Sequence, residues 1–231
     1  MKVRFGAGLA DARGSTAGIT YSRNKGGSYQ RARVTPVNPN TSAQAAQRSR
    51  ISQLSQQWSN LLTQAERDDW AIFGANFPTT DVFGEVIQLT GLQAYTRINS
   101  RIMAGGFAAI TAAPADQAVT DLLTFSFVLD NGAGACEVTF TPTPLAANDV
   151  VQLFATPGLS PGISNAKNRL RLILTSGLAV ASPLDFEAAY VTKFGSLPLA
   201  GRKVFMEARA LRSTTGAVDA RLVATTIVVN T

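Results

Sequence analysis

The stretch Leu123-Thr-Phe-Ser-Phe-Val-Leu129 decides how this sequence divides, because apolar and polar side chains largely alternate through it. Alternation with a period of two is typical of a β-strand that buries one of its faces. Before about Asp116 the apolar residues recur every three or four positions, which is typical of helices. The sequence therefore predicts an α+β fold in which a helical part precedes a β part.

Further strand-like runs follow Leu129, and turn signals such as Asp130-Asn-Gly132 and Thr214-Thr-Gly216 separate them. The runs are Glu137–Thr141, Asp149–Thr156, Arg169–Leu174, Lys203–Leu211 and Arg221–Val229. The run 185–190 fits either a short helix or an extra strand. Short strands at this spacing favour an antiparallel β-sandwich of the immunoglobulin or fibronectin type over residues 116–231. The Cys…Trp…Cys pattern of antibody domains is absent, which excludes a domain of that kind.

A small helical unit of two to three helices is predicted for residues 41–115. Thr41 or Ser42 can cap the first helix, and two capping boxes, Thr63-Gln-Ala-Glu66 and Thr90-Gly-Leu-Gln93, predict where later helices begin. Two apolar stripes at helical spacing give the expected core: Ile51, Leu54, Trp58 and Leu61, then Leu92, Tyr95, Ile98 and Ile102. Trp58 and Trp70 fit a core better than a ligand platform.

The excess positive charge is confined to the start of the chain. Residues 1–50 contain nine Lys or Arg and one Asp, a net charge of +8, whereas the whole chain carries +6. Residues 51–231 therefore sum to −2. The basic segment is rich in Gly and Ser and poor in large apolar residues, so it cannot build a core of its own. We expect residues 1–40 to form an extended basic arm that becomes ordered on a partner.

A β-hairpin is plausible within this arm. The runs Ile19–Arg23 and Ser28–Val34 are strand-like, and Asn24-Lys-Gly-Gly27 fits the turn between them. A loop with an odd number of residues would place a set of five basic and aromatic side chains on a single face of the hairpin. A loop with an even number would divide the set between the two faces. The set is Tyr21, Arg23, Tyr29, Arg31 and Arg33, and the sequence does not fix the register.

The sequence lacks the side chains on which most catalytic and metal sites depend. It has no His and a single Cys, Cys136, which lies in a strand-like run and is expected to be a buried, inert thiol. The acid pairs Asp68/Asp69 and Asp185/Glu187 have nothing that positions them for catalysis, and Gly6-x-Gly8 and Gly132-x-Gly134 are only fragments of phosphate-binding loops. We expect no enzyme, no metal site and no cofactor.

Neither a signal peptide nor a membrane span is expected. The start, Met-Lys-Val-Arg-Phe-Gly, has no apolar stretch, and the least polar run, Ala104–Pro114, is too short and too broken to cross a bilayer. We expect a protein made in the cytoplasm and without a membrane partner. The polar run 158–168 at one end of the β part could be a binding loop or a simple connection.

Three interpretations of the arm follow from its residues. Arg can pair with carboxylates of another subunit, and arm strands could extend a neighbouring sheet, which favours a protein partner. Basic side chains interleaved with Tyr21 and Tyr29 could instead hold nucleic acid. The third interpretation is a plain solubilising tail. We rank the protein partner first.

One long motif resembles a known family. The run from Ser22 to Thr41, SRNKGGSYQRARVTPVNPNT, continues into a second set of residues: Gln44, Arg48, Leu54, Ser55, Trp58, Leu62-Thr63, Glu66-Arg67, Trp70, Leu89–Tyr95, Asn99, Leu159–Gly162 and Asn168–Arg171. Together these resemble virion structural proteins of tailed phages and prophages, over most of the chain. The resemblance implies a virion component and carries over no catalytic or binding residues.

We therefore expect a capsid-binding cement or decoration protein of a bacteriophage, located in the virion and made in the host cytoplasm. Its partners would be the major capsid protein or other virion subunits, and it would form a homo-oligomer. The expected anchoring residues are Arg23, Lys25, Tyr29, Arg31 and Arg33. A tail, neck or connector protein is the alternative within this class, and a nucleic-acid-binding protein is the alternative of another class.

Overall fold

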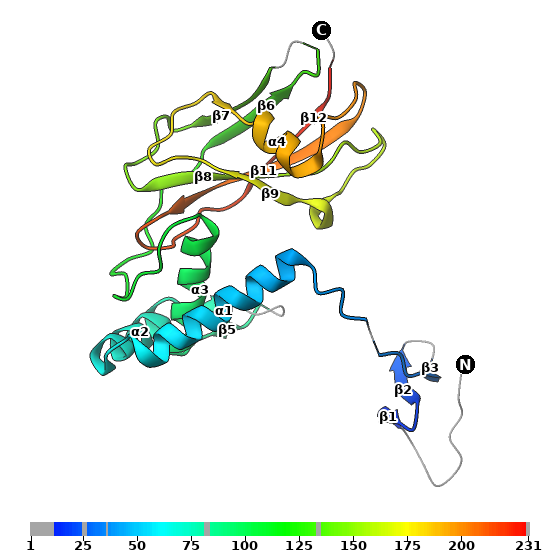
Figure 1. Ribbon diagram of the computed structural model, residues 1–231, viewed down its shortest axis with the longest axis vertical. Helices are drawn as coiled ribbons and strands as arrows, with labels where there is room; N and C mark the ends of the chain where they lie inside the picture. The colour runs from blue at the N-terminus through cyan, green and yellow to red at the C-terminus, as the bar shows by residue number, and fades with distance from the viewer. Residues whose placement is uncertain (1–11, 25–26, 36, 81–83, 133–134, 230–231) are drawn as a thin grey trace. The chain divides into compact units, whose positions relative to one another are not determined.

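The computed structural model describes residues 12–24, 27–35, 37–80, 84–132 and 135–229, and all structural statements below concern these residues. Helices and antiparallel sheets occur together in one chain, which confirms the α+β class (Figure 1). The chain divides into two compact units with the boundary between Ala45 and Ala46.

The first unit is built around a three-stranded antiparallel sheet. Its strands are β1 (Gly14–Thr16), β2 (Ile19–Asn24) and β3 (Gly27–Ala32), with β2 in the middle. The predicted hairpin is thus present as β2 and β3, and β1 is an additional strand that the sequence did not suggest. The turn between β1 and β2 needs two residues with positive φ, Ala17 and Gly18.

Three helices follow, the first of which crosses the unit boundary, and their starts are capped as predicted. They are α1 (Ser42–Asn60), α2 (Gln64–Asn76) and α3 (Gly91–Ala104). Thr63 and Thr90 each form a complete capping box. Thr41 rather than Ser42 caps α1, because its hydroxyl accepts from the Gln44 backbone N–H at 3.3 Å. Each box satisfies backbone N–H groups that have no partner inside the helix.

The helical core centres on Tyr95, which both Trp rings contact. The ring centroids of Trp58 and Trp70 lie 5.5 and 5.3 Å from that of Tyr95. Leu54, Trp70 and Tyr95 are fully buried. The prediction for the first stripe is wrong at both of its ends, since Ile51 is 51% exposed and Leu61 60% exposed. The surface against which α1 packs is narrow, so it covers only Leu54 and part of Trp58.

A short β-hairpin and a loop held by hydrogen bonds complete the helical part. Strands β4 (Thr79–Thr80) and β5 (Val86–Ile87) pair between α2 and α3. After α3, the buried side chain of Asn99 accepts from the Ile110 N–H at 2.7 Å and donates to its carbonyl at 3.1 Å. The Trp70 Nε1–H donates to the Thr111 carbonyl at 2.6 Å. These bonds hold the loop against α2 and α3.

The β part consists of two antiparallel sheets. Three strands form the order β10-β7-β6 and four form the order β12-β11-β8-β9. The bounds are β6 Thr124–Leu129, β7 Cys136–Thr141, β8 Asp149–Ala155, β9 Arg171–Thr175, β10 Leu184–Asp185, β11 Lys203–Arg212 and β12 Leu222–Ile227. The run 185–190 takes both forms that the sequence allowed, since β10 is followed by α4 (Glu187–Phe194).

The two sheets share one apolar core. Phe127 and Val138 from the first sheet and Leu153 and Met206 from the second belong to the same buried cluster. Cys136 is part of it at 1% exposure, and burial above all raises the pKa of its thiol to about 11. The expectation of a buried thiol is confirmed, and a thiol with this pKa is almost entirely protonated at neutral pH.

The outer face of the four-stranded sheet is covered over part of β11, whereas Val223 and Ile227 of β12 are exposed on it. Leu159 and Ala166, from the 158–168 run, pack on Phe205, which identifies that run as a covering segment. Near the other end of β11, Leu211 lies against Gly105, where an added Cβ would come within 2.7 Å of the leucine Cδ2. The helical and β parts are therefore in direct contact.

Candidate protein-interaction surface

The register of the N-terminal sheet settles which face each side chain takes. Tyr21 pairs with Gln30 and Arg23 with Ser28, whereas Tyr29 pairs with Ser22 and Arg31 with Thr20. Directly opposite residues on antiparallel strands share a face. Tyr21 and Arg23 therefore lie on one face of the sheet, and Tyr29 and Arg31 lie on the other. The loop has two residues, so the even-length alternative holds.

The remaining predicted anchoring residues are Arg33 and Lys25. Arg33 follows β3, and its backbone N–H donates to the Gly18 carbonyl at 2.7 Å, which ties the end of β3 to the turn before β2. Lys25 falls in the loop between β2 and β3, outside the described residues. The structure thus brings Tyr21 beside Arg23 and Tyr29 beside Arg31 but does not unite the five residues on one surface.

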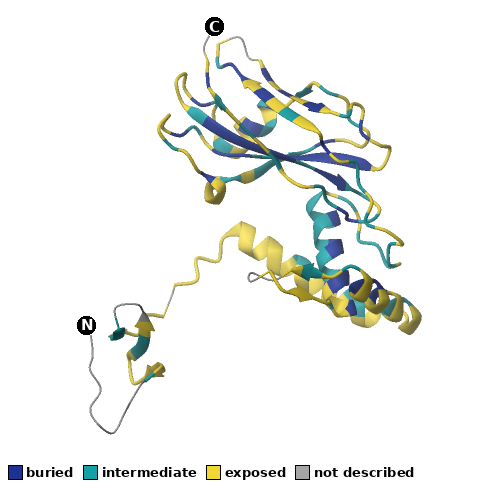
Figure 2. Ribbon diagram, turned by 180° about the vertical axis from the view of Figure 1, so that it is seen from behind, coloured by how far each residue is buried: buried dark blue, intermediate teal, exposed yellow. Residues whose placement is uncertain are grey.

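No residue described within 12–45 is buried (Figure 2). Arg23 and Arg31 are exposed, Tyr21 and Tyr29 are partly exposed, and Val34 and Val37 after the sheet are 77% and 88% exposed. Burial of apolar surface is the main force that opposes the entropy of ordering a chain. The segment lacks that force within itself, so a stable conformation calls for a surface outside it.

The exposed surface continues into the first turns of α1. Every residue from Ser42 to Ser49 is exposed, and Leu54 is the only described residue of the helix that is buried. A helix with polar side chains on all sides gains little from packing within its own chain. The start of α1 therefore presents polar surface that its own chain does not cover.

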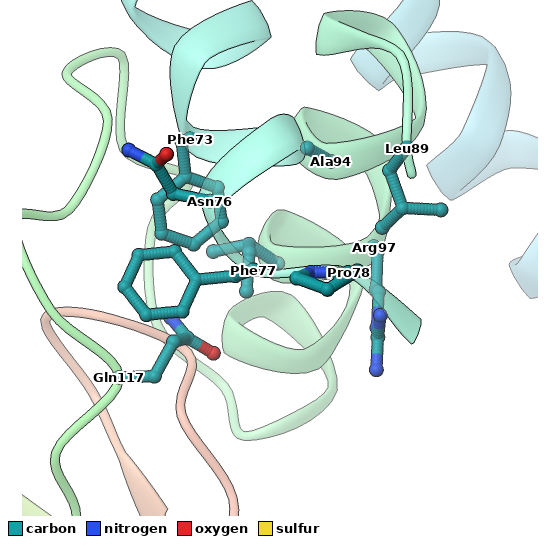
Figure 3. A pocket seen from close by; sticks show the side chains of 9 residues that line it. Phe73, Asn76, Phe77, Pro78, Leu89, Ala94, Arg97 and Gln117 are labelled. Carbon is teal, nitrogen blue, oxygen red and sulfur yellow. The ribbon is translucent and has the colours of Figure 1, made fainter. Parts of the chain in front are cut away.

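A small pocket is the first of two other sites that sequence reasoning missed. It has a volume of about 260 Å³ and lies between the end of α2 and α3. Figure 3 shows the rings of Phe73 and Phe77 beside one another, with the polar groups of Asn76, Arg97 and Gln117 around them. The volume is below the usual range for small-molecule sites. No sequence motif marks it, because its lining comes from separate elements.

The second missed site is a cluster of arginines on the outer face of the four-stranded sheet. The guanidinium groups of Arg209 and Arg221 lie 5.1 and 4.8 Å from the ring centroid of Phe154. Arg209 Nε donates to Gln152 Oε1 at 2.9 Å, and Arg221 pairs with Glu207 at 2.9 Å. The period-two pattern of β11 could have suggested that Glu207 and Arg209 share a face.

These contacts give the arginine cluster a structural role. Glu207 is 2% exposed and has its counter-ion in Arg221. Arg209 also acts on Arg101 of α3. Burial, then the charges of Arg97 and Arg209, lower the pKa of Arg101 to about 10, so Arg101 keeps its proton at neutral pH. The Arg209–Gln152 hydrogen bond joins β11 to β8, and the Arg221–Glu207 ion pair joins β11 to the residue before β12, so the cluster strengthens the sheet.

The acidic side chains that could serve catalysis or bind a metal are dispersed or engaged locally in the described ranges. Across the described ranges no three side chains of His, Cys, Asp or Glu gather as metal ligands would. Asp68 accepts from Gln64 Nε2, and Asp185 accepts from the Glu187 backbone N–H, so both acids take part in local helix-start contacts. No helix within the described part of the chain has the length and apolar character needed to cross a membrane.

Comparison of the chain with protein-family models, with curated proteins and with solved structures finds no match.

Proposed function

We propose that this chain is a structural protein of a bacteriophage virion that binds the assembled capsid as a cement or decoration protein. The observation that carries the proposal is the N-terminal segment, which has strands and a defined register but no buried residue among those described. Such a segment gains a stable conformation by lying on another molecule. The resemblance of residues 22–41 and of the later motifs to phage virion proteins supplies the biological setting.

The partner in this proposal is a protein, and the major capsid protein is the first candidate. Arginine makes paired hydrogen bonds to carboxylates, which suits Arg23 and Arg31 to an acidic protein surface. A nucleic-acid platform stacks successive bases on aromatic rings of one surface. Tyr21 and Tyr29 lie on opposite faces of the sheet, which favours the protein partner over nucleic acid.

The β part completes the proposal as an immunoglobulin- or fibronectin-like β-sandwich. Its support is the arrangement of strands, three in the order β10-β7-β6 and four in the order β12-β11-β8-β9, around one core. Such a domain would project from the particle or join a neighbouring copy of the chain. The role is binding without catalysis, in keeping with a sequence that has no His.

Removal of residues 1–40 tests the proposal. The encoding phage or prophage is prepared without the gene for this chain, and its particles are incubated with the full-length or the truncated protein. The full-length protein should co-sediment with particles and the truncated protein should not. Association of the truncated protein at the full-length level would refute the role of the arm.

Two further readouts separate the alternatives. A decoration protein should be present in many copies over the capsid surface, whereas a tail, neck or connector protein should be present as a single ring. Binding to DNA should fall steeply with salt if nucleic acid is the partner, because each neutralised phosphate releases counterions. Under our proposal the purified protein shows no such DNA binding.

A further inference from the structure

The N-terminal sheet has two faces of nearly the same chemistry. One face carries Tyr21 and Arg23, and the other carries Tyr29 and Arg31. Each face thus presents one aromatic ring with one guanidinium two residues along the same strand. In both cases the arginine is exposed and the tyrosine is partly exposed.

This symmetry is unusual for a sheet that rests on a single surface. An antiparallel sheet with one covered face commonly places apolar side chains on that face and polar side chains on the other. Here the face of Tyr21 adds Ile19, and the face of Tyr29 adds a hydroxyl pair, Ser15 with Thr20 at 2.8 Å. Neither face is distinctly apolar, and neither has a buried residue.

We propose that the N-terminal sheet inserts between two acidic protein surfaces, so that one chain ties two virion subunits together. Tyr21 and Arg23 contact one subunit, and Tyr29 and Arg31 contact its neighbour. The inference rests on the proposed function, because it names the geometry by which the arm binds.

Charge supports two occupants, and size limits how much of the interface the sheet can supply. Each face carries one exposed arginine, Arg23 or Arg31, and a guanidinium suits a carboxylate on the surface that it contacts. Strands of about six residues, spaced about 4.8 Å apart, give the sheet a footprint of roughly 200–300 Å² per face. A stable interface buries about 800 Å² on each partner. One face alone falls well short of this area, and both faces together, at roughly 400–600 Å², do not reach it, so the sheet is one part of a larger contact.

Site-specific photo-crosslinking tests the proposal. The photoreactive residue p-benzoylphenylalanine replaces Tyr21 in one full-length variant and Tyr29 in another. Each variant is bound to nuclease-treated particles that lack the endogenous protein, irradiated and analysed by mass spectrometry. We expect both positions to form adducts with virion protein, at two different surface patches. Adducts from one position only, adducts of both positions with the same patch, or adducts with nucleic acid would overturn the inference.

Charge reversal provides an independent measurement. Arg23→Glu and Arg31→Glu should each weaken association with particles at least tenfold. Arg169→Glu, which reverses an exposed arginine beside β9 in the other unit, is the matched control and should leave association unchanged. Loss of binding from one reversal with no effect of the other would show a single contact face. If the full-length protein itself does not bind particles, the proposed function fails and the inference fails with it.

Discussion

Deletion of residues 1–40 should leave the stability of the remaining protein almost unchanged. No residue described within 12–40 is buried, and Thr41, which caps α1, is kept. Changes at exposed sites usually alter the free energy of unfolding by less than about 0.5 kcal/mol. For a domain of this size about 1 kcal/mol corresponds to about 2–4 °C in Tm. The Tm of the truncated protein should therefore lie within about 2 °C of the full-length value.

Differential scanning calorimetry of both proteins measures this difference, and Leu54→Ala in the full-length chain provides the contrast. Leu54 is fully buried in α1, and replacement of a core leucine by alanine costs about 2–5 kcal/mol. That variant should melt at least about 4 °C lower. A fall of more than about 5 °C on deletion of residues 1–40 would show that the segment packs within the chain, and the argument for an external partner would be lost.

Three further predictions concern the second unit. Asp149→Asn should cost about 3 kcal/mol, because it removes the buried partner of Arg212 at 2.7 Å. Burial raises the pKa of Asp149, but the hydrogen bonds from Arg212 and Thr120 lower it by more, so the net shift of the pKa is downward. The difference in unfolding free energy between the unmodified protein and the variant should therefore be full above about pH 4 and shrink as the pH falls below that value. Urea titrations at several pH values measure this difference. Cys136 should react with a thiol reagent only after unfolding, and rapid labelling of native protein would contradict its burial at 1% exposure. Gly216→Ala should destabilise by about 1–3 kcal/mol in thermal melts, since φ is +62° and the new Cβ would lie 2.9 Å from Ile98 Cγ2; an unchanged Tm would show that the contact between helical and β parts is loose.

The sequence predicts local features of the fold well where one short motif determines them. The boxes at Thr63 and Thr90 locate two helix starts because their hydrogen bonds lie within four residues. Exposure of Ile51 and Leu61 could not be predicted in this way. Helical spacing shows which residues share a face, but the width of the surface opposite that face depends on distant parts of the chain.

The candidate site shows the same limit. The strands of the hairpin follow from composition, whereas the division of Tyr21 and Tyr29 between two faces depends on a loop one residue longer or shorter. The pocket beside Phe73 and the arginines around Phe154 arise from elements far apart in the sequence. Only a three-dimensional arrangement brings them together.

The most direct test of the central claim is a cryo-electron microscopy map of purified virions at a resolution that shows side chains. Our account predicts that the protein lies on the capsid and that residues 14–32 are ordered between two protein surfaces. Acidic side chains of the partners should lie near Arg23 and Arg31. Absence of the protein from the particles, or an N-terminal segment in contact with packaged DNA or with no other molecule, would contradict the account.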